Sequence, residues 1–196
     1  MSLLLLALLG YAIGSIPFSF LVARLFGVKD VRAVGSGNVG ATNVMRSAGK
    51  LPGILALLLD GSKGAVTVLL ARGLTTSEAE VCVAGLCAMI GHLFPVWLAF
   101  RGGKGVATGA GLFLPLAPGA LGIAALTFVA TVAITRYVSL ASILASLALP
   151  VAAYLLGGTA TVVATALVAA LMVVAKHHAN LGRLARGVEP KLGAKK

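Results

Sequence analysis

Long apolar runs with very few charges are the feature that most restricts how this chain can fold. Six runs cover residues 3–26, 51–71, 81–100, 106–135, 138–156 and 159–175. As helices, they match or approach the roughly 30 Å hydrocarbon core of a bilayer. Only 11% of the residues are charged, against roughly a quarter in soluble domains. We therefore expect an all-α polytopic membrane protein with one domain, residues 1–196, and exclude the soluble enzyme classes.

Two of these runs need comment before they are assigned to helices. The run 3–26 is too long for a cleaved signal peptide, and no small-residue cleavage site follows it, so we expect it to stay as a span. The run 106–135 has no charged residue, but it is too long for one crossing and contains Pro115, Pro118 and Gly119 near its middle. Proline disrupts a helix interior. The sequence thus predicts two helices here, either short spans or a re-entrant pair, and seven transmembrane helices in total.

The distribution of basic residues tests this division. With seven helices and the N-terminus outside, Arg72 is the one basic residue on the outside, and Lys63 lies within the membrane. If the fourth span were unbroken, seven basic residues would lie inside and eight outside. Basic residues collect on the cytoplasmic side of membrane proteins, so the broken version is favoured, with a cytoplasmic C-terminus. Fourteen residues are then inside: Arg24, Lys29, Arg32, Arg46, Lys50, Arg101, Lys104, Arg136, Lys176, Arg183, Arg186, Lys191, Lys195 and Lys196.

The net charge of +11 would suggest nucleic acid in a soluble protein. In a membrane protein, the topology rule explains it first, and anionic lipid headgroups or a phosphorylated substrate are two further explanations. Cys82 and Cys87 lie in one apolar run without CxxC spacing. We therefore expect buried thiols rather than a disulfide or a metal site.

The first polar cluster is GSGNVGATN at residues 35–43, followed by Arg46. It contains the GxGxxG pattern, but membrane helices flank it where a dinucleotide-binding fold would need a βαβ unit. Glycines let backbone N–H groups approach an anion closely. The cluster therefore predicts an anion cradle, and the alternative is a tight interfacial loop with helix caps. The candidate donors are Ser36, Asn38, Thr42, Asn43 and Arg46.

The second cluster is DGSKG at residues 60–64, deep in the run 51–71. Asp60 and Lys63 are three residues apart and so share a helix face. Ionisable residues within a span usually mark a functional site or an internal pair. A self-satisfied structural pair explains them equally well, and we assign neither residue a catalytic role.

The third cluster joins GHLFP at residues 91–95 to RGGKGVAT at residues 101–108. It is not a Walker A loop, since no Ser or Thr follows Lys104. Glycines around a lysine at a helix start still predict a phosphate site, although a basic topology anchor explains Arg101 and Lys104 as well. His92 is expected about two turns inside its span, as a hydrogen-bonded packing residue rather than a base.

The fourth cluster is KHHANLGRL at residues 176–184, with Glu189 beyond it. His177 and Asn180 are one helical turn apart and are expected to face the same way. A basic amphipathic tail lying on anionic lipid explains the arginines and lysines, but leaves those two residues without a role. Ser139 and Ser142, which open the run 138–156, are expected to face the same pocket.

The residues that are scarce also restrict the chemistry. Five scattered acids supply neither a glycosidase carboxylate pair nor an oxygen cage for Mg²⁺ or Ca²⁺, and three histidines with two distant cysteines disfavour zinc. Two non-enzymatic alternatives remain open. One is a transporter or channel for an anionic solute, although matching inverted halves are not found. The other is a basic membrane anchor, which gives the glycine clusters no role.

Taken together, the first, third and fourth clusters resemble the three signatures of the bacterial acyl-phosphate:glycerol-3-phosphate acyltransferases (PlsY). DGSKG and RYVSL are similar to family segments too, and the resemblance runs along the whole chain in order. It implies a seven-helix enzyme of the bacterial cytoplasmic (inner) membrane whose active site faces the cytoplasm. Such an enzyme moves a fatty acyl group from acyl phosphate to the sn-1 hydroxyl of glycerol 3-phosphate. The products are lysophosphatidic acid and inorganic phosphate, in the first acylation step of phospholipid synthesis.

The resemblance also implies roles for individual residues. Lys104 and its neighbouring glycines would hold the phosphate of glycerol 3-phosphate, and the first cluster would hold the acyl phosphate with the developing oxyanion. The expected partners are these substrates and membrane lipid, with no nucleic acid, no cofactor and no metal, and we expect a monomer to act. The predicted catalytic residues are His177, which would activate the hydroxyl, Asn180, Ser36 and Arg46. The predicted substrate-binding residues are Gly37, Asn38, Gly40, Thr42, Asn43, His92, Gly102, Gly103, Lys104, Gly105, Thr108, Ser139 and Ser142.

Overall fold

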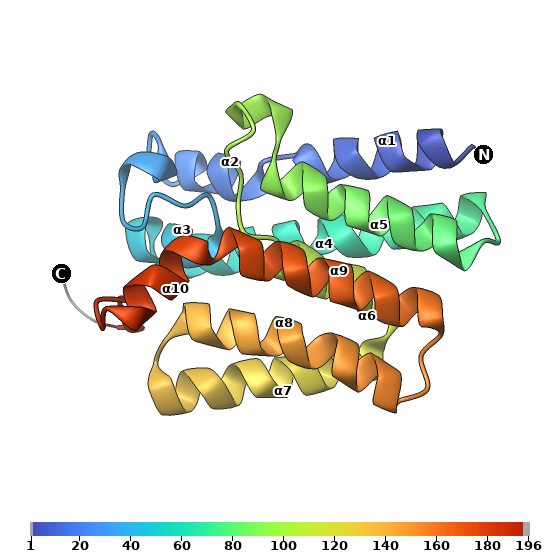
Figure 1. The fold of residues 1–196 in the computed structure, drawn as a ribbon. Coiled ribbons are helices and arrows are strands. Elements are labelled where there is room, and N and C mark those ends of the chain that lie inside the picture. Colours follow the sequence, from blue (N-terminus) through green and yellow to red (C-terminus); the bar gives the residue numbers. More distant parts are fainter. Residues whose placement is uncertain (1, 194–196) are drawn as a thin grey trace. The chain divides into compact units, whose positions relative to one another are not determined.

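A computed structural model describes residues 2–193, and these residues form helices and connecting loops without any strand (Figure 1). The all-α expectation is confirmed for this part of the chain. The helices are α1 (Leu3–Ser15), α2 (Phe18–Leu25), η1 (Val31–Ala33), α3 (Ala41–Ala48), α4 (Lys50–Leu74), α5 (Glu78–Leu93), η2 (Val96–Leu98), α6 (Val106–Leu116), α7 (Pro118–Thr135), α8 (Val138–Leu155), α9 (Ala160–Lys176) and α10 (His178–Ala185).

By length and composition, five segments of the described chain can cross a membrane: Leu3–Leu25, Lys50–Leu74, Glu78–Leu98, Pro118–Thr135 and Val138–Leu155. A sixth is possible if α9 and α10, which are bent by 59° relative to each other, count as one broken span. At 1.5 Å per residue, the 11 residues of α6 reach only about 16 Å, roughly half a hydrocarbon core. The protein is thus a multi-pass membrane protein.

The predicted interruption of the run 106–135 is confirmed. It falls at Ala117, which is not helical and precedes Pro118 at the first turn of α7. Proline lacks an N–H group, but the first residues of a helix have no intrahelical partner for that group, so Pro118 starts a helix well. Pro115 lies in the last turn of α6. The two prolines therefore separate α6 from α7.

The chain divides into two compact units, Met1–Pro115 and Leu116–Lys196. In the first unit, α1 packs closely along α5 through small residues. A Cβ atom added at Gly10 would overlap the backbone of Ala84, and one added at Gly14 would overlap the backbone of Ala88. Small residues four apart allow helix backbones in membranes to approach closely. This packing fixes α1 and α5 as neighbours that run in the same direction.

The helix α6 packs against α4 in the same way. A Cβ atom at Gly64 would overlap the backbone of Thr108, and one at Gly111 would overlap the carbonyl oxygen of Gly61. The Thr108 hydroxyl also donates to the Asp60 carbonyl oxygen at 2.9 Å. The side chain of Thr108 therefore joins two helices.

In the second unit, α7, α8 and α9 follow one another through short turns and pack in sequence. Their buried positions are mostly alanines, which allow close approach: Ala120, Ala124, Ala141, Ala145, Ala152, Ala153, Ala166, Ala169 and Ala170. The chain then bends at His177, where α9 gives way to α10.

Several predicted boundaries are wrong, each for a local reason. The run 3–26 holds one candidate span, Leu3–Leu25, as expected, but it consists of two helices, because Pro17 has no N–H group and α1 ends before it. Residues 27–50, which lie between the first two apolar runs, contain the helix α3. In the run 81–100, the α-helix α5 ends at Leu93 and only the short 3-10 helix η2 follows Pro95, so His92 lies in the last turn of α5. His177 and Asn180 do not share one helix, because the bend falls at His177.

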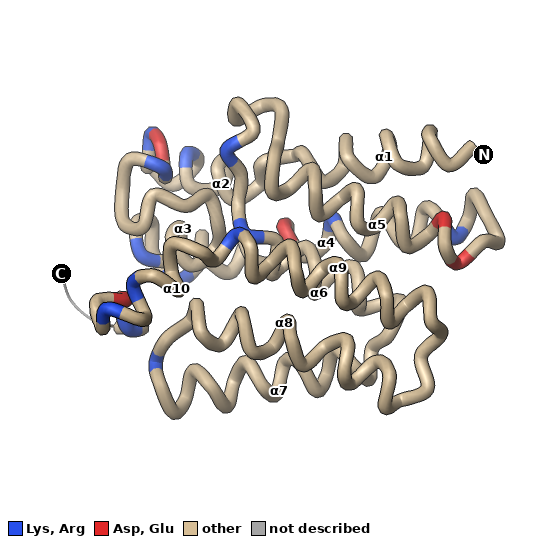
Figure 2. The backbone as a smooth tube through the Cα atoms, in the orientation of Figure 1, with Lys and Arg blue, Asp and Glu red and all other residues tan. Residues whose placement is uncertain are grey.

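Most basic residues gather at one end of the helices within each unit (Figure 2). In the first unit, most basic residues lie around α2 and α3 and in the loop before α6. Lys63 lies within α4, and Arg72 lies in the last turn of α4, shortly before Glu78 and Glu80 in the first turn of α5. In the second unit, they follow the end of α7 and the end of α9. Successive helices in that unit are antiparallel, so these two positions lie at one end of it.

Candidate active site

The loop before α3 is organised by the side chain of Asn43. Its Nδ2 atom donates to the carbonyl oxygens of Val31 at 2.8 Å, Val34 at 3.0 Å and Asn38 at 3.0 Å. Its Oδ1 atom accepts from the Ser36 backbone N–H at 2.9 Å. Asn43 is buried, and its amide is used by the loop backbone. It is therefore placed to shape the cradle rather than to face a ligand.

Glycines give this loop its course. Gly35 and Gly37 have positive φ angles of 61° and 71°, a conformation that favours glycine. A side chain at Gly35 would also collide with the Asn43 amide. Gly40 is the extended residue that precedes α3. The loop can bend this tightly only with the small residues found in the sequence.

The candidate donors of the first cluster differ in exposure. Ser36 is exposed, while Asn38 and Thr42 are half-buried. The Oδ1 atom of Asn38 is buried and has no hydrogen-bond partner among residues 2–193. Arg46 lies in the last turn of α3 and is exposed. Buried polar atoms are normally paired, so Asn38 has capacity to bind a ligand or water.

A neighbouring ion pair is internal to this loop region. Arg32 binds Asp30 with a shortest N–O distance of 2.8 Å. The hydrogen bond from the Arg32 side chain, with another from its backbone N–H, lowers the pKa of Asp30 to about 2. Arg32 is thus committed to Asp30, and the carboxylate remains charged at neutral pH.

The loop before α6 is hydrogen-bonded to the end of α5. The N–H groups of Gly102 and Gly103 donate to the carbonyl oxygens of Leu93 and His92 at 3.2 and 3.1 Å. Gly105 has a φ angle of +83° immediately before α6. Lys104 lies between these glycines and is half-buried. The glycines therefore place a lysine and the first turn of a helix together, as the sequence predicts for a phosphate site.

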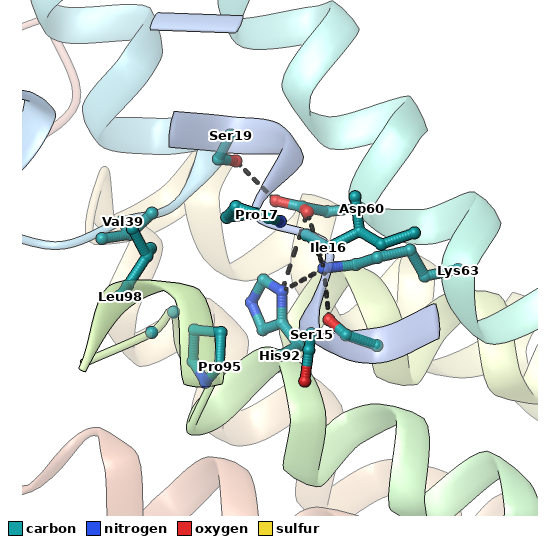
Figure 3. Close-up of a pocket in the computed structure, with 13 residues that line it drawn as sticks. Ser15, Ile16, Pro17, Ser19, Val39, Asp60, Lys63, His92, Pro95 and Leu98 are labelled. Atoms are coloured by element: carbon teal, nitrogen blue, oxygen red, sulfur yellow. Dashed lines mark hydrogen bonds and ion pairs between the residues drawn. The ribbon is translucent and has the colours of Figure 1, made fainter. Parts of the chain in front are cut away.

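The first and third clusters meet in the structure. A Cβ atom added at Gly103 would lie 2.7 Å from the Val39 carbonyl oxygen and would also overlap the His92 ring. Beside this contact is a small pocket (Figure 3). The pocket is lined by the α1–α2 break, by Val39, by the end of α5 with the following turn, by Gly102 and Gly103, and by Asp60 and Lys63.

The second cluster also reaches this pocket. Asp60 and Lys63 are buried and lie 3.0 Å apart as an ion pair. The Lys63 Nζ atom is 2.9 Å from the Nδ1 atom of His92. The expectation that His92 is hydrogen-bonded is confirmed, and its position connects the ion pair to the glycine loop. Sequence reasoning missed Ser19, which donates to the Asp60 Oδ2 atom at 2.5 Å, although Pro17 signals a break at this point.

Two predicted substrate ligands have hydroxyl groups that bind the protein itself. The Thr108 hydroxyl binds the Asp60 carbonyl oxygen, as described above. The Ser142 hydroxyl donates to the Val138 carbonyl oxygen one turn earlier in α8, at 2.8 Å. Both side chains are buried, so these contacts support helix packing.

The fourth cluster centres on Glu189 within the second unit. Glu189 accepts from Ser139 at 2.7 Å, from Asn180 at 2.6 Å and from Arg183 at 2.7 Å. Burial alone would raise the pKa of Glu189, but these hydrogen bonds outweigh burial and hold the pKa below its usual value. The sequence associated Ser139 with Asn180, and the structure joins them through the carboxylate.

The buried ring of His177 lies where α9 ends. Its Nδ1 atom is 2.8 Å from the Val173 carbonyl oxygen. A carbonyl oxygen only accepts, so Nδ1 carries the hydrogen and Nε2 is the basic nitrogen of the neutral ring. Among the described residues, no group of three or more His, Cys, Asp or Glu side chains is arranged to hold a metal.

Comparisons with known proteins identify the family of this chain. The family model for glycerol-3-phosphate acyltransferase matches residues 4–187. A glycerol-3-phosphate acyltransferase of Synechococcus sp. (strain CC9902) is 47% identical over 99% of this chain and 96% of its own. That of Jannaschia sp. (strain CCS1) is 49% identical over 96% of this chain and 92% of its own.

Solved structures give the same result. The chain is similar to PlsY (YgiH), an integral membrane glycerol 3-phosphate acyltransferase, in its glycerol 3-phosphate form. The identity is 38%, the TM-score is 0.93, and 98% of this chain and 96% of that chain are covered. The lysophosphatidic acid form of PlsY matches with 36% identity and a TM-score of 0.91 over the same shares. The resemblance stated from the motifs is confirmed: this chain belongs to the glycerol-3-phosphate acyltransferase family.

Proposed function

We propose that this protein transfers a fatty acyl group from acyl phosphate to the sn-1 hydroxyl of glycerol 3-phosphate. The hydroxyl oxygen attacks the acyl carbonyl carbon, and the bond from that carbon to the phosphate oxygen breaks. Phosphate departs with the bonding electrons, and the hydroxyl proton passes to a base or to the departing phosphate. The products are 1-acyl-glycerol 3-phosphate, which is lysophosphatidic acid, and inorganic phosphate.

The observation that carries this proposal is the meeting of the two glycine loops at Val39 and Gly103. One loop precedes α3 and the other precedes α6, so two helix starts with glycine-rich backbones lie close together. Helix starts of this kind favour phosphate groups. The similar PlsY chain has been solved in forms named for glycerol 3-phosphate and for lysophosphatidic acid, which supports a site for a phosphate-bearing acceptor and its acylated product.

Within this site, we assign Lys104 and the glycines around it to the phosphate of glycerol 3-phosphate. The other loop would hold the acyl phosphate through Ser36, Asn38 and backbone N–H groups, with Arg46 also assigned there. Acyl phosphate is a mixed anhydride with a good leaving group. Orientation and stabilisation of charge can therefore supply much of the rate enhancement. We assign Asn43 to holding this loop in shape rather than to binding substrate, because its amide is hydrogen-bonded to the loop backbone.

His177 is our candidate for activating the hydroxyl, with Asn180 as a polar partner. The hydrogen bond to Val173 leaves Nε2 as its basic nitrogen, which supports a role as proton acceptor. We predict that His177 acts together with the two glycine loops. Direct transfer without an acyl-enzyme follows from the mechanism, so an acyl group trapped on Ser36 or Ser142 would contradict it.

We further propose seven spans, with the N-terminus outside and the C-terminus and active site on the cytoplasmic side of the bacterial inner membrane. The basic end of each unit supports this orientation. The seven spans would be the five long segments, which include α7, the α9–α10 pair and the short helix α6. The acyl chain would enter laterally from the bilayer, and one copy of the chain would suffice.

A single assay tests the reaction. Protein purified in detergent or lipid cubic phase would be given glycerol 3-phosphate with acyl phosphate, and phosphate release and the position of the acyl group would be measured. Acyl-CoA would replace acyl phosphate in a parallel reaction. We expect phosphate release and 1-acyl product with acyl phosphate alone. Transfer from acyl-CoA with none from acyl phosphate would overturn the donor assignment.

A further inference from the structure

The buried Asp60–Lys63 pair bridges the break between α1 and α2 (Figure 3). The Lys63 Nζ atom lies 3.0 Å from the carbonyl oxygens of both Gly14 and Ile16, at the end of α1. Asp60 accepts from Ser19 in the first turn of α2 at 2.5 Å. A cation at a helix C-terminus and an anion at a helix N-terminus are both favourable. The pair therefore stabilises the two free helix ends that Pro17 creates.

The same ammonium group fixes the state of His92. An ammonium has hydrogens to donate and no lone pair to accept with. The Nδ1 atom of His92, 2.9 Å from the Lys63 Nζ atom, must therefore accept the hydrogen bond, so Nε2 carries the ring hydrogen. Asp60 lies 3.7 Å from the same Nδ1 atom. The ion pair thus determines both the tautomer and the position of the imidazole.

The other edge of the imidazole faces the glycine loop before α6. A Cβ atom added at Gly103 would overlap the Nε2 atom of His92. The backbone N–H group of Gly103 donates to the His92 carbonyl oxygen at 3.1 Å. The adjacent Gly102 donates to the Leu93 carbonyl oxygen. The loop therefore packs against His92 through Gly103, and Lys104 directly follows Gly103 in the chain.

We propose that Asp60, Lys63 and His92 form a positioning relay that holds the loop of residues 102–105 in its phosphate-binding conformation. The inference rests on the proposed assignment of that loop to glycerol 3-phosphate. None of the three residues touches substrate in this scheme, so His92, which the family resemblance placed among the substrate-binding residues, acts here through the loop instead. They act through the backbone that carries Lys104, so their removal weakens glycerol 3-phosphate binding and spares the chemical step.

A purely structural ion pair makes a different prediction. Removing one partner of a buried pair is strongly destabilising, whereas neutralising both is often tolerated. The double variant Asp60→Asn/Lys63→Met removes both charges and keeps similar side-chain volumes. If the pair only supports the fold, this variant should bind glycerol 3-phosphate as the wild type does. If it positions His92, binding should weaken although the protein is folded.

A second variant, His92→Phe, keeps a ring and removes both nitrogens without changing the charges of the pair. The matched control is Thr67→Val, one turn further along α4 from Lys63. Thr67 is equally buried, and its hydroxyl binds the Lys63 carbonyl oxygen within the helix at 2.8 Å. It does not line the pocket, so this substitution should change neither binding nor turnover.

The experiment measures glycerol 3-phosphate binding by titration calorimetry, and KM and kcat with acyl phosphate. We expect the double variant and His92→Phe to bind glycerol 3-phosphate about tenfold more weakly, as loss of one charge-assisted contact would do. KM should rise in parallel, and kcat at saturation should change by less than about threefold. Wild-type binding in either folded variant, or a fall in kcat at constant KM, would overturn the relay.

The remaining outcomes are also decisive. If the wild type binds glycerol 3-phosphate but releases no phosphate from acyl phosphate, the proposed donor is wrong, and the binding comparison still decides the relay. If the wild type does not bind glycerol 3-phosphate, both proposals are wrong. If both variants fail to fold while Thr67→Val folds, the cluster serves folding alone and the relay is rejected.

Discussion

The substitution Asn43→Ala tests whether the first glycine loop depends on one buried amide. In the structure, this amide donates to three backbone carbonyl oxygens and accepts from the Ser36 N–H group, at 2.8–3.0 Å. Alanine removes every one of these bonds while leaving the helix propensity of α3 intact or improved. The loop should then open without unfolding the helices.

The size of the effect follows from the contacts. The amide nitrogen has two hydrogens, so its three contacts correspond to two bonds, and the oxygen supplies a third. At about 1 kcal/mol for each net hydrogen bond, the loop loses roughly 3 kcal/mol. Because about 1.4 kcal/mol corresponds to tenfold in an equilibrium constant, the open state should become roughly 150-fold more populated.

Hydrogen exchange measures this opening directly. We expect the Ser36 amide to exchange roughly 150-fold faster in Asn43→Ala, with most acyltransferase activity lost. The variant Asn43→Asp should be no better, because a carboxylate oxygen would then face three carbonyl oxygens. Ser47→Ala, which removes a hydroxyl bound to the Asn43 carbonyl oxygen at 2.8 Å, is the control on the same helix. Unchanged exchange at Ser36 with a raised KM would refute the reasoning and restore Asn43 as a ligand.

Four further changes test other parts of the molecule. Lys104→Ala should raise KM for glycerol 3-phosphate by about 10- to 100-fold, and a normal KM in steady-state kinetics would remove it from that site. His177→Ala should lower kcat by about 10²- to 10⁴-fold if it activates the hydroxyl, whereas near-wild-type turnover would assign the proton to the departing phosphate or a water. Gly14→Leu should destabilise the first unit by about 1–3 kcal/mol or more, since its Cβ atom would overlap the Ala88 backbone; an unchanged Tm would contradict that packing. Glu189→Gln should lose stability at neutral pH. The pKa of Glu189 is lower in the folded protein than in the unfolded chain, so the carboxylate stabilises the fold above the usual carboxyl pKa and ceases to do so as the pH falls through the lowered value. The Tm values of wild type and variant should therefore converge as the pH falls through the lowered pKa of Glu189, and a difference that stays constant with pH would contradict this cause.

Local signals predicted several features of the fold. The apolar runs predicted the helices because backbone groups in hydrocarbon must be paired internally. Pro115 and Pro118 predicted the interruption between α6 and α7, which is confirmed at Ala117. Pro17 was an equally clear signal, but the long apolar run around it led to the prediction of one helix. Composition alone does not show where a proline is tolerated.

The helix–helix contacts were harder to predict. Gly10 and Gly14 are four residues apart, as are Ala84 and Ala88, but glycine and alanine are common throughout this chain. Only the close approach of α1 to α5 selects these residues from the others. Many pairs of small-residue stripes are compatible with the same sequence.

The candidate site shows the same division. The sequence grouped Ser36, Asn38 and Asn43 as donors of one kind, because their side chains offer similar chemistry. In the structure, the Asn43 amide is used by the loop backbone, while the Oδ1 atom of Asn38 is buried without a partner among residues 2–193. Residue type indicates which hydrogen bonds are available, and the tertiary structure determines which are already made.

The amino-acid sequence by itself determined that this protein is a multi-pass membrane protein and that it belongs to an acyltransferase family. Both follow from properties that are read along the chain, namely hydropathy, proline positions and the order of motif residues. Only the tertiary structure decided that Lys63 reaches His92 and the two carbonyl oxygens at the α1–α2 break, and that Val39 meets Gly103. Such contacts join residues tens of positions apart, and they depend on which helix faces pack together, a choice that local sequence does not encode.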